Sequence, residues 1–319
     1  MKKPYKTSSE EIAKMREVIS RTDNEEAILF TTYLIDLIKQ RTGKAETLNR
    51  IASNCNLNYN DLSRFPIKKH AYLAKVCLTY NLSLNNSIEL YYRSGLCLSY
   101  TYPEDEKYLN SVVSDRNNLP KEVNTESKVD CLLRLVKNHV YADSKNYDEN
   151  EFRKTMRGIQ EKIVNENTES ERNGLFVEII NLLKKETAQY LWIMESGKDS
   201  LNNESRRYTV FEISFAAQFN KKETIELYRS FGYSLAPDQI KFDAFVSWLL
   251  DLKLGNIDYE RYHLYKTVAS DMDKVKVGAF HYSAPSPEGL DNLLKTMEYY
   301  EREDIEELIY NKEMEDNYL

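Results

Sequence analysis

The chain has 319 residues and a mass of 37.5 kDa, a length typical of about two domains. It contains only 9 glycines and 7 prolines, too few for the frequent tight turns of a β-sandwich or barrel, so we expect helices. The net charge of -7 is unevenly distributed, because residues 1–70 hold 13 Lys/Arg and 9 Asp/Glu while the remainder is acidic. The overall negative charge disfavours non-specific binding to nucleic acid, but the basic N-terminal region can contact phosphate groups.

The four cysteines are far apart in the sequence and include no Cys-x-x-Cys pair. We therefore expect buried free thiols in a reducing compartment, and hence a cytoplasmic protein. The basic N-terminus is followed by Ser- and Glu-rich sequence without the apolar core of a signal peptide. No run approaches the roughly 18 apolar residues of a membrane-spanning helix, so we expect no membrane association.

Two amphipathic helices are predicted at the N-terminus. The first covers residues 8–22, where Met15 and Ile19 share one face. The second begins near Glu25 and ends at Gly43, because glycine readily adopts the left-handed conformation of a helix end. Its predicted buried residues are Ile28, Leu29, Tyr33, Leu34, Leu37 and Ile38.

Two short helices are predicted next, at 45–53 and 58–65. They are separated by residues 54–57, Asn-Cys-Asn-Leu, and asparagine tolerates the left-handed conformation that a sharp turn between helices requires. The spacing of apolar residues predicts two further helices, at 69–81 and 84–95.

The middle of the chain changes character twice. Residues 101–127 are polar and contain Pro103 and Pro120, which indicates a non-helical connection. Helical periodicity returns in 128–141 and in 150–164.

The last part of the chain begins with a polar stretch, 165–173, that we interpret as a linker or an exposed loop. An apolar helical stripe restarts over 175–185. Ser286 and Pro287 are suited to cap and open a final helix, whose outer face and end are acidic.

The sequence also contains an internal similarity. Residues 76–95 and 213–232 align without a gap at an offset of 137, and each reads as a helix, a polar cap, a second helix and a glycine. This order of features also arises by chance, but the fixed offset across matched residues favours a duplication. We therefore expect the two segments to superpose, with Ile88 and Ile225 equivalent and both buried.

Residues 57–65, Leu-Asn-Tyr-Asn-Asp-Leu-Ser-Arg-Phe, resemble the turn and recognition helix of Cro/repressor-type (Xre-like) helix-turn-helix proteins. The resemblance covers residues 28–98 and returns over 175–250, where 230–235 are similar to an extension found in some members. It implies an all-α fold of two diverged copies of a lambda-repressor-like helical unit plus a C-terminal helix. The implied divisions are a helix-turn-helix-like unit in 1–127, a helical connector in 128–172, a degenerate second copy in 173–268, and a C-terminal helix with an acidic tail in 269–319.

The resemblance also implies a DNA-binding surface, with the helix at 58–65 in the major groove. In that position Asn58 caps the helix, Tyr59 and Asn60 approach base edges, and nearby basic residues contact phosphates. The residues assigned to DNA binding are Arg41, Lys44, Asn58, Tyr59, Asn60, Arg64, Lys68 and Lys69. The connection after this helix is shorter than in the family, and the second copy has no room for a complete helix-turn-helix. The second copy is therefore expected to serve dimerisation or effector sensing.

The leading hypothesis is a DNA-binding regulatory protein that acts as a homodimer. The alternative is a non-catalytic helical adaptor or immunity-type protein, with a degenerate helix-turn-helix, that binds a protein or peptide partner. No phosphate-cradle, zinc-hydrolase or serine-nucleophile motif occurs, so we predict no enzyme activity, no cofactor and no metal site. The four histidines are expected to be hydrogen-bonded structural residues, and the 24 tyrosines to lie mainly at the rim of the core.

Overall fold

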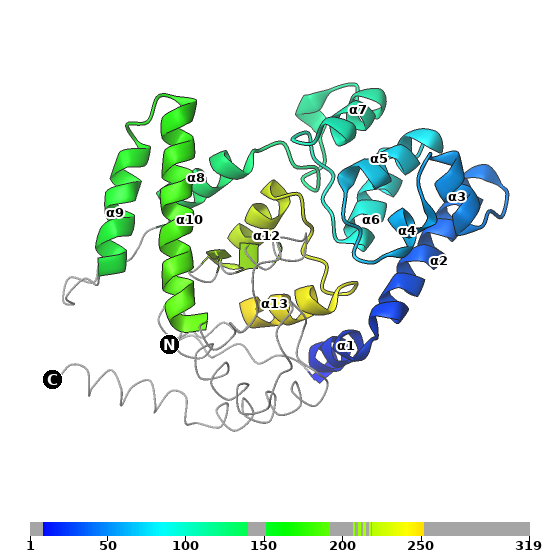
Figure 1. Cartoon of the computed structure of the whole chain (residues 1–319), viewed down its shortest axis with the longest axis horizontal. Coiled ribbons are helices and arrows are strands. Elements are labelled where there is room, and N and C mark those ends of the chain that lie inside the picture. The colour runs from blue at the N-terminus through cyan, green and yellow to red at the C-terminus, as the bar shows by residue number, and fades with distance from the viewer. Residues whose placement is uncertain are drawn as a thin grey trace.

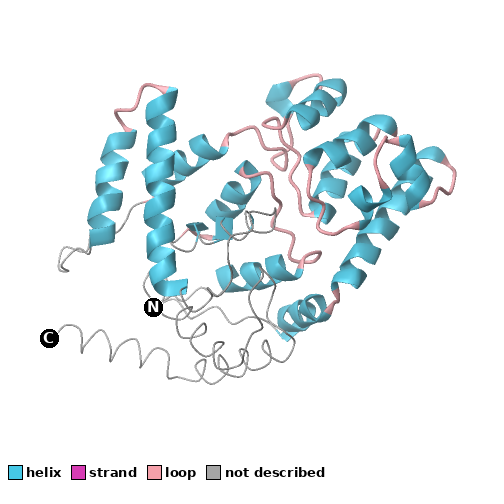
Figure 2. Cartoon of the chain, in the orientation of Figure 1, coloured by secondary structure: helices cyan, strands magenta, loops and turns pink. Residues whose placement is uncertain are grey.

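The computed structural model of this chain describes residues 9–139, 151–191, 207, 210–211, 213–214, 217 and 219–251. These residues are mostly helical and none belongs to a strand of a sheet, which confirms the all-α prediction (Figure 2). None of the described helices combines the length and the apolar character that a membrane crossing needs. Buried apolar side chains from Met15 to Leu250 belong to one continuous core.

The N-terminal half is a run of seven helices that ends at residue 112. They are α1 (Ser9–Ser20), α2 (Asp23–Thr42), α3 (Leu48–Asn54), α4 (Tyr59–Ser63), α5 (His70–Thr79), α6 (Leu84–Ser94) and α7 (Pro103–Val112). We call residues 23–112, which comprise α2 to α7, the first unit. Local signals set several of these boundaries. Thr22 and Glu25 form a capping box at the start of α2, and Gly43 closes it with φ +70° as predicted.

The buried face of α2 differs from the prediction. Phe30, Leu34 and Ile38 are buried, whereas Ile28 and Leu29 are 51% and 50% exposed. The stripe that faces the core follows the i, i+4, i+8 spacing from Phe30, and residues one and two positions earlier point away from that stripe. The predicted burial of Ile28 and Leu29 is therefore wrong.

The segment predicted as a non-helical connection, 101–127, contains a helix. Pro103 occupies the first position of α7, where its missing N–H is one that a helix leaves unbonded in any case. Asp105 and Tyr108 in this helix are fully buried. A short 3₁₀ helix, Arg116–Asn118, follows. Proline here marks a helix start, and the prediction treated it as a break.

The remaining described helices are α8 (Lys128–Asn138), α9 (Glu151–Ile163), α10 (Glu169–Leu191), α12 (Lys221–Ser230) and α13 (Lys241–Asp251). Helix α10 begins inside the stretch predicted as a loop, because Thr168 and Glu171 cap it reciprocally. Helices α8, α9 and α10 pack together, α12 packs on α8, and α13 packs on α1 (Figure 1). The predicted final helix and acidic tail lie outside the described residues.

We call the described residues of 207–251 the second unit. Gly232 has φ +84° and Gly95 has φ +82°, so the aligned glycines share the left-handed conformation. Ser83 and Asn220 are both helix N-caps whose side chains accept a backbone N–H three residues on. Ile88 and Ile225 share the same degree of exposure, but both are only half-buried. The prediction of full burial is wrong at both positions, because their neighbours two and three residues on take the central core places.

Candidate nucleic-acid interface

The helix-turn-helix segment is formed by α3, a four-residue turn and α4. The Thr47 side chain accepts the N–H of Arg50 and caps α3. Asn56 has φ +52°, the left-handed conformation predicted for an asparagine in this turn. The N–H of Leu57 donates to the carbonyl of Ala52 at 2.9 Å, which fixes the exit from the turn. The sequence pattern therefore produces two short helices joined by a tight, hydrogen-bonded turn.

Helix α4 has one buried side and one exposed side. Leu62 is fully buried and anchors the helix against the core. Asn58 is the N-cap residue, and its N–H donates to Oδ2 of Asp61 at 2.9 Å. Tyr59 is 49% exposed and Asn60 is also exposed. The two side chains assigned to base contacts therefore point to the surface, while the Asp61 carboxylate already accepts a bond at the helix start.

The short connection after α4 is fixed by apolar contacts. Pro66 disfavours a helical conformation of the residue before it, and Arg64 is already extended at the end of α4. The Phe65 ring packs on Phe30 of α2 with their centroids 5.7 Å apart, and Ile67 is buried. Arg64, immediately before these anchors, is left exposed.

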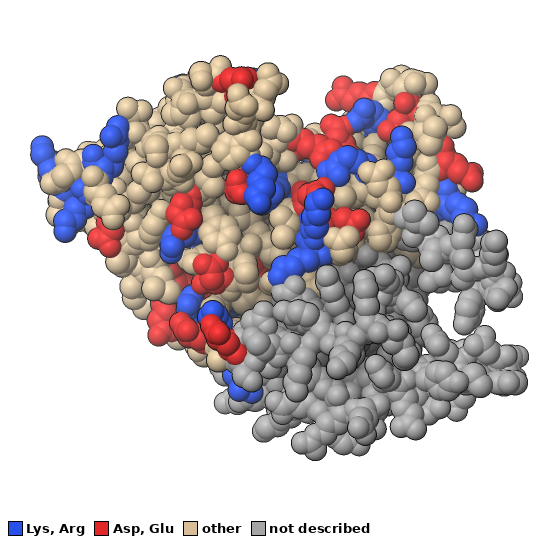
Figure 3. Space-filling model, turned by 180° about the vertical axis from the view of Figure 1, so that it is seen from behind, with Lys and Arg blue, Asp and Glu red and all other residues tan. Residues whose placement is uncertain are grey.

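Positive charge is concentrated in this region. Residues 39–69 contain seven Lys/Arg and two Asp/Glu, and all seven basic side chains are exposed. Both carboxylates have local partners, because Glu46 accepts bonds from Asn54 and Tyr80, and Asp61 accepts one from Asn58. In the rear view, Lys and Arg side chains gather at the left-hand edge, on the side where α2 and α3 lie (Figure 3).

The basic residues assigned to phosphate contact do not all have the same environment. The Arg41 Nε donates to the carbonyls of Tyr80 and Asn81, so this side chain also caps the end of α5. The Lys69 ammonium lies 5.6 Å from the centroid of the Tyr72 ring. In the part of the chain that the structure describes, Arg64 and Lys44 make no side-chain hydrogen bond or ion pair, so each is available to an external anion.

A second feature is a cavity of about 360 Å³ between residues 116–126, α8 and α12. Its charged lining consists of Arg116, Lys121, Arg134, Arg229, Glu126 and Glu226. Arg134 binds both carboxylates, at 2.7 Å to Glu126 and 3.0 Å to Glu226. The Arg229 guanidinium donates to the carbonyl of Lys121 at 3.0 Å. Arg116 pairs with Glu106 at 3.4 Å. Among the described residues this leaves Lys121 and Arg229 as the lining cations without a carboxylate partner, and they favour an anionic occupant.

The cysteines and the described histidines behave as structural residues. All four cysteines are buried free thiols, and burial raises the pKa of Cys77, Cys97 and Cys131 to about 12. His70 and His139 both lie beside carboxylates, whereas His263 and His281 lie outside the described residues. Among the described residues no cluster of His, Cys, Asp and Glu has the arrangement of a metal site.

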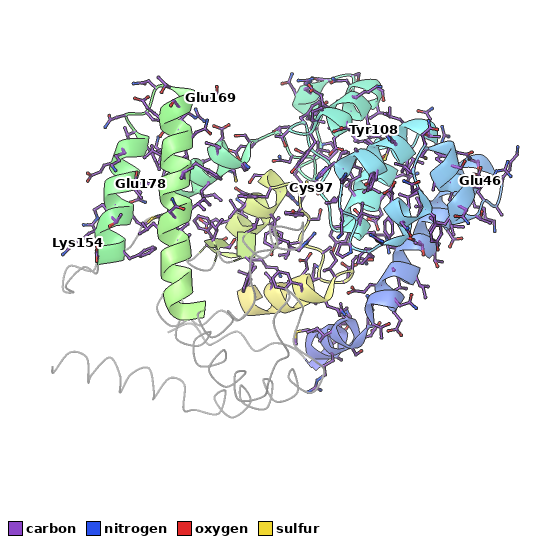
Figure 4. The ribbon with its side chains drawn as sticks, in the orientation of Figure 1. Glu46, Cys97, Tyr108, Lys154, Glu169 and Glu178 are labelled. Carbon is purple, nitrogen blue, oxygen red and sulfur yellow. The ribbon has the colours of Figure 1, made fainter. Side chains whose placement is uncertain are left out.

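The tyrosines differ from the prediction in one respect. Tyr91, Tyr108 and Tyr228 are among the largest fully buried side chains, although a position at the rim of the core was expected. The Tyr91 hydroxyl donates to Oδ1 of Asp105 at 2.5 Å, so burial is accompanied by a hydrogen bond. Figure 4 labels Tyr108, whose hydroxyl donates to the carbonyl of Leu82 at 2.9 Å. The sequence signal for this polar core was Asp105, an acidic residue at the third position of a helix that was not predicted.

Comparison with protein-family models, with curated proteins and with solved structures finds no match to this chain.

Proposed function

We propose that this protein is a DNA-binding regulator that contacts DNA through α4 and the basic residues around it. The observation that carries the proposal is the combination of a core-anchored α4, whose exposed side presents Tyr59 and Asn60, with the exposed basic residues of 39–69. Phosphate contacts from Lys and Arg supply most of the affinity for DNA, and side chains directed at base edges supply the choice of sequence. Asparagine pairs well with adenine in the major groove.

The test is a fluorescence-anisotropy titration of the full chain against a library of duplex fragments at several salt concentrations. Arg64→Ala and Lys69→Ala should each weaken binding to all fragments alike and lower the salt slope by about one unit. Asn60→Ala should instead relax the preference for one base, by roughly 1–3 kcal/mol of discrimination. Lys222→Ala is the matched control, because Lys222 is exposed on α12 in the second unit, away from α4.

The proposal fails if no fragment binds better than random DNA at low salt. It also fails if Lys222→Ala lowers affinity as much as Arg64→Ala does, because a non-specific cation effect would then explain the binding. Unaltered far-UV circular dichroism of each variant keeps loss of folding separate from loss of contact.

For the second unit we propose effector sensing at the cationic cavity, with a small anionic molecule as the ligand class. Arg229 of α12 and Lys121 of the connection line this cavity together, so an occupant would touch both the second unit and the segment that follows α7. Thermal-shift titration with inorganic phosphate and with succinate should raise the melting temperature of the native chain. Arg229→Ala should abolish the rise and Lys222→Ala, on the same helix, should retain it. No shift at millimolar concentrations of either anion would contradict this role.

A homodimer is a separate proposal, based on the paired half-sites that helix-turn-helix proteins normally use. The surface of the first unit around Gly95 is already occupied, because the N–H of Ser234 in the second unit donates to the Gly95 carbonyl. A homodimer would therefore have to form through another surface. Light scattering of the purified chain across micromolar concentrations measures its molar mass and therefore its oligomeric state.

One observation favours the adaptor function as a second candidate. Ile28 and Leu29, adjacent on α2, are both about half exposed. DNA provides few favourable contacts for such apolar side chains. Exposed apolar residues on a helix suit a protein or peptide partner. If no DNA fragment binds at low salt, the adaptor is the function that the structure supports.

A further inference from the structure

The contacts between the first and second units include an antiparallel bridge between Leu96 and Tyr233. The N–H of Cys97 donates to the carbonyl of Gly232 at 2.9 Å, and the N–H of Ser234 donates to the carbonyl of Gly95 at 3.0 Å. At the offset of 137 that relates the two sequences, these two hydrogen bonds are counterparts of one another, and the Leu96–Tyr233 pair is its own counterpart. The bridge is therefore reciprocal, as is the contact between two identical subunits across a twofold axis. Cys97, labelled in Figure 4, lies between the first unit and α12.

A nitrogen-bearing side chain from each unit crosses to the other at this bridge. The His70 Nε2 lies 3.1 Å from the carbonyl oxygen of Gly232, and the Arg207 guanidinium donates to the carbonyl of Gly95. Positions 70 and 207 again differ by 137. Each of these two side chains thus contacts the carbonyl of the opposite unit's helix-ending glycine.

The carboxylates that bind His70 and Arg207 also occupy equivalent positions in the two units. Asp105 and Asp243 are each fully buried and each the third residue of their helix, α7 and α13. Asp105 accepts from His70 at 2.7 Å and Asp243 accepts from Arg207 at 2.5 Å. Each also accepts a backbone N–H from its own unit's strand-like segment, from Ser99 at 3.1 Å and from Ala236 at 2.8 Å. The aspartates are 138 apart and the amide donors 137 apart, so the correspondence extends well beyond the aligned helices.

The two glycines at the bridge explain why the units come so close. A Cβ on Gly95 would overlap Ile240 and the Arg207 guanidinium, and a Cβ on Gly232 would overlap the Tyr102 hydroxyl and His70. In both cases the overlapping atoms belong to the opposite unit. Each glycine thus provides both the left-handed helix end and the space for the other unit's side chains.

We propose that the chain is an internal pseudo-dimer, in which the second unit occupies the self-association face of the first and acts as its built-in partner. The two units then face one another about a local twofold axis between Leu96 and Tyr233. This face is satisfied within one chain, so it does not join two chains. The inference rests on the interface alone and is independent of DNA binding.

The test uses disulfide capture in the full chain carrying Cys97→Ser, a change that gives the first unit the serine found at position 234. Leu96 and Tyr233 form a pair flanked by hydrogen bonds, in which Cα atoms are about 4.5 Å apart, a separation that a disulfide spans. The double variant Leu96→Cys/Tyr233→Cys is oxidised mildly and examined by intact mass and non-reducing electrophoresis. We expect one disulfide within the chain and a monomeric species. The remaining native cysteines are buried and do not compete.

The single variants Leu96→Cys and Tyr233→Cys are the matched controls, and neither should form a covalent dimer. A covalent dimer from Leu96→Cys alone would show that first units pair between chains, and a dimer from the double variant would show exchange of units. Either result overturns the proposal, as does a folded double variant that forms no disulfide.

Hydrogen exchange of the unmodified chain tests the interface without a substitution. The amides of Cys97 and Ser234 donate across the interface, so both should exchange slowly and at similar rates. Fast exchange at both positions in a folded chain would also overturn the proposal.

Discussion

Corresponding polar groups in the two units are not equally satisfied. In the first unit, Tyr91 donates to Oδ1 of Asp105, and the other carboxylate oxygen accepts from His70 and Ser99. In the second unit, the hydroxyl of Tyr228 and Oδ1 of Asp243 are buried and have no hydrogen-bond partner among the described residues. Tyr91 and Tyr228 differ in number by 137, so the same pair of side chains is bonded in one unit and separated in the other.

The polar groups that the two units bring to their shared interface are therefore held by different interactions. The first unit uses a connected polar network of Tyr91, Asp105 and His70. The second relies on one ion pair, Arg207 with Asp243, in which burial raises the pKa of the carboxyl while the guanidinium and a backbone amide oppose that rise. A buried ion pair is costly to break but contributes little compared with well-packed apolar residues. The second unit should therefore be more sensitive to loss of one charge and less sensitive to loss of a hydroxyl.

The largest effect is expected from Asp243→Ala, which leaves the buried Arg207 guanidinium without a counter-charge. We expect a loss of about 3–5 kcal/mol in the free energy of unfolding, measured by urea denaturation. The control is the double variant Arg207→Met/Asp243→Leu, which removes both charges and should recover most of the loss. A loss below about 1 kcal/mol for Asp243→Ala would mean that water reaches the ion pair. The second unit would then not be especially sensitive to the loss of one charge.

The glycine variants give the next largest effect and compare three left-handed helix ends. Gly43→Ala should cost about 1–2 kcal/mol, because φ is +70° although no described atom beyond the neighbouring residues lies within 4 Å of the added methyl group. Gly95→Ala and Gly232→Ala add overlap with the opposite unit, which should raise the cost by a further 1–3 kcal/mol, as overpacking roughly does. Equal losses at all three positions in urea denaturation would show that the units are not in close contact in solution.

Local signals allowed much of the fold to be predicted from the sequence. The end of α2 at Gly43, the left-handed Asn56 and the helix at 84–95 each depend on a few consecutive residues and on helical periodicity. The exposed positions of Tyr59 and Asn60 follow from the same periodicity once Leu62 is buried. Their role in DNA binding stays a prediction.

The interface between the units could not be predicted in this way, because its partners are far apart in sequence. His70 was expected to be a hydrogen-bonded structural residue, but its sequence neighbours gave no sign of its partners. The Tyr102 ring stacks on it at a centroid distance of 3.7 Å, and Gly232 contacts it from the second unit. The helix that supplies Asp105 was missed because Pro103 was interpreted as a break. The repeat at an offset of 137 was the only available signal, and it aligned two helices without indicating that they face one another.

The smallest effect is a matched pair of hydroxyl deletions that tests the comparison most directly. Tyr91→Phe removes a 2.5 Å hydrogen bond to a buried carboxylate and should cost about 1.5–3 kcal/mol, the range for bonds to charged groups. Tyr228→Phe removes a hydroxyl that has no partner in the described part of the chain, so the free energy of unfolding should be unchanged or slightly higher. Both rings are fully buried and the substitutions are identical, so packing changes cancel in the difference between them. Urea denaturation of the two variants side by side measures that difference. If Tyr228→Phe proves as costly as Tyr91→Phe, then Tyr228 and Asp243 are bonded in solution, directly or through a water, and the two units have equally complete polar cores.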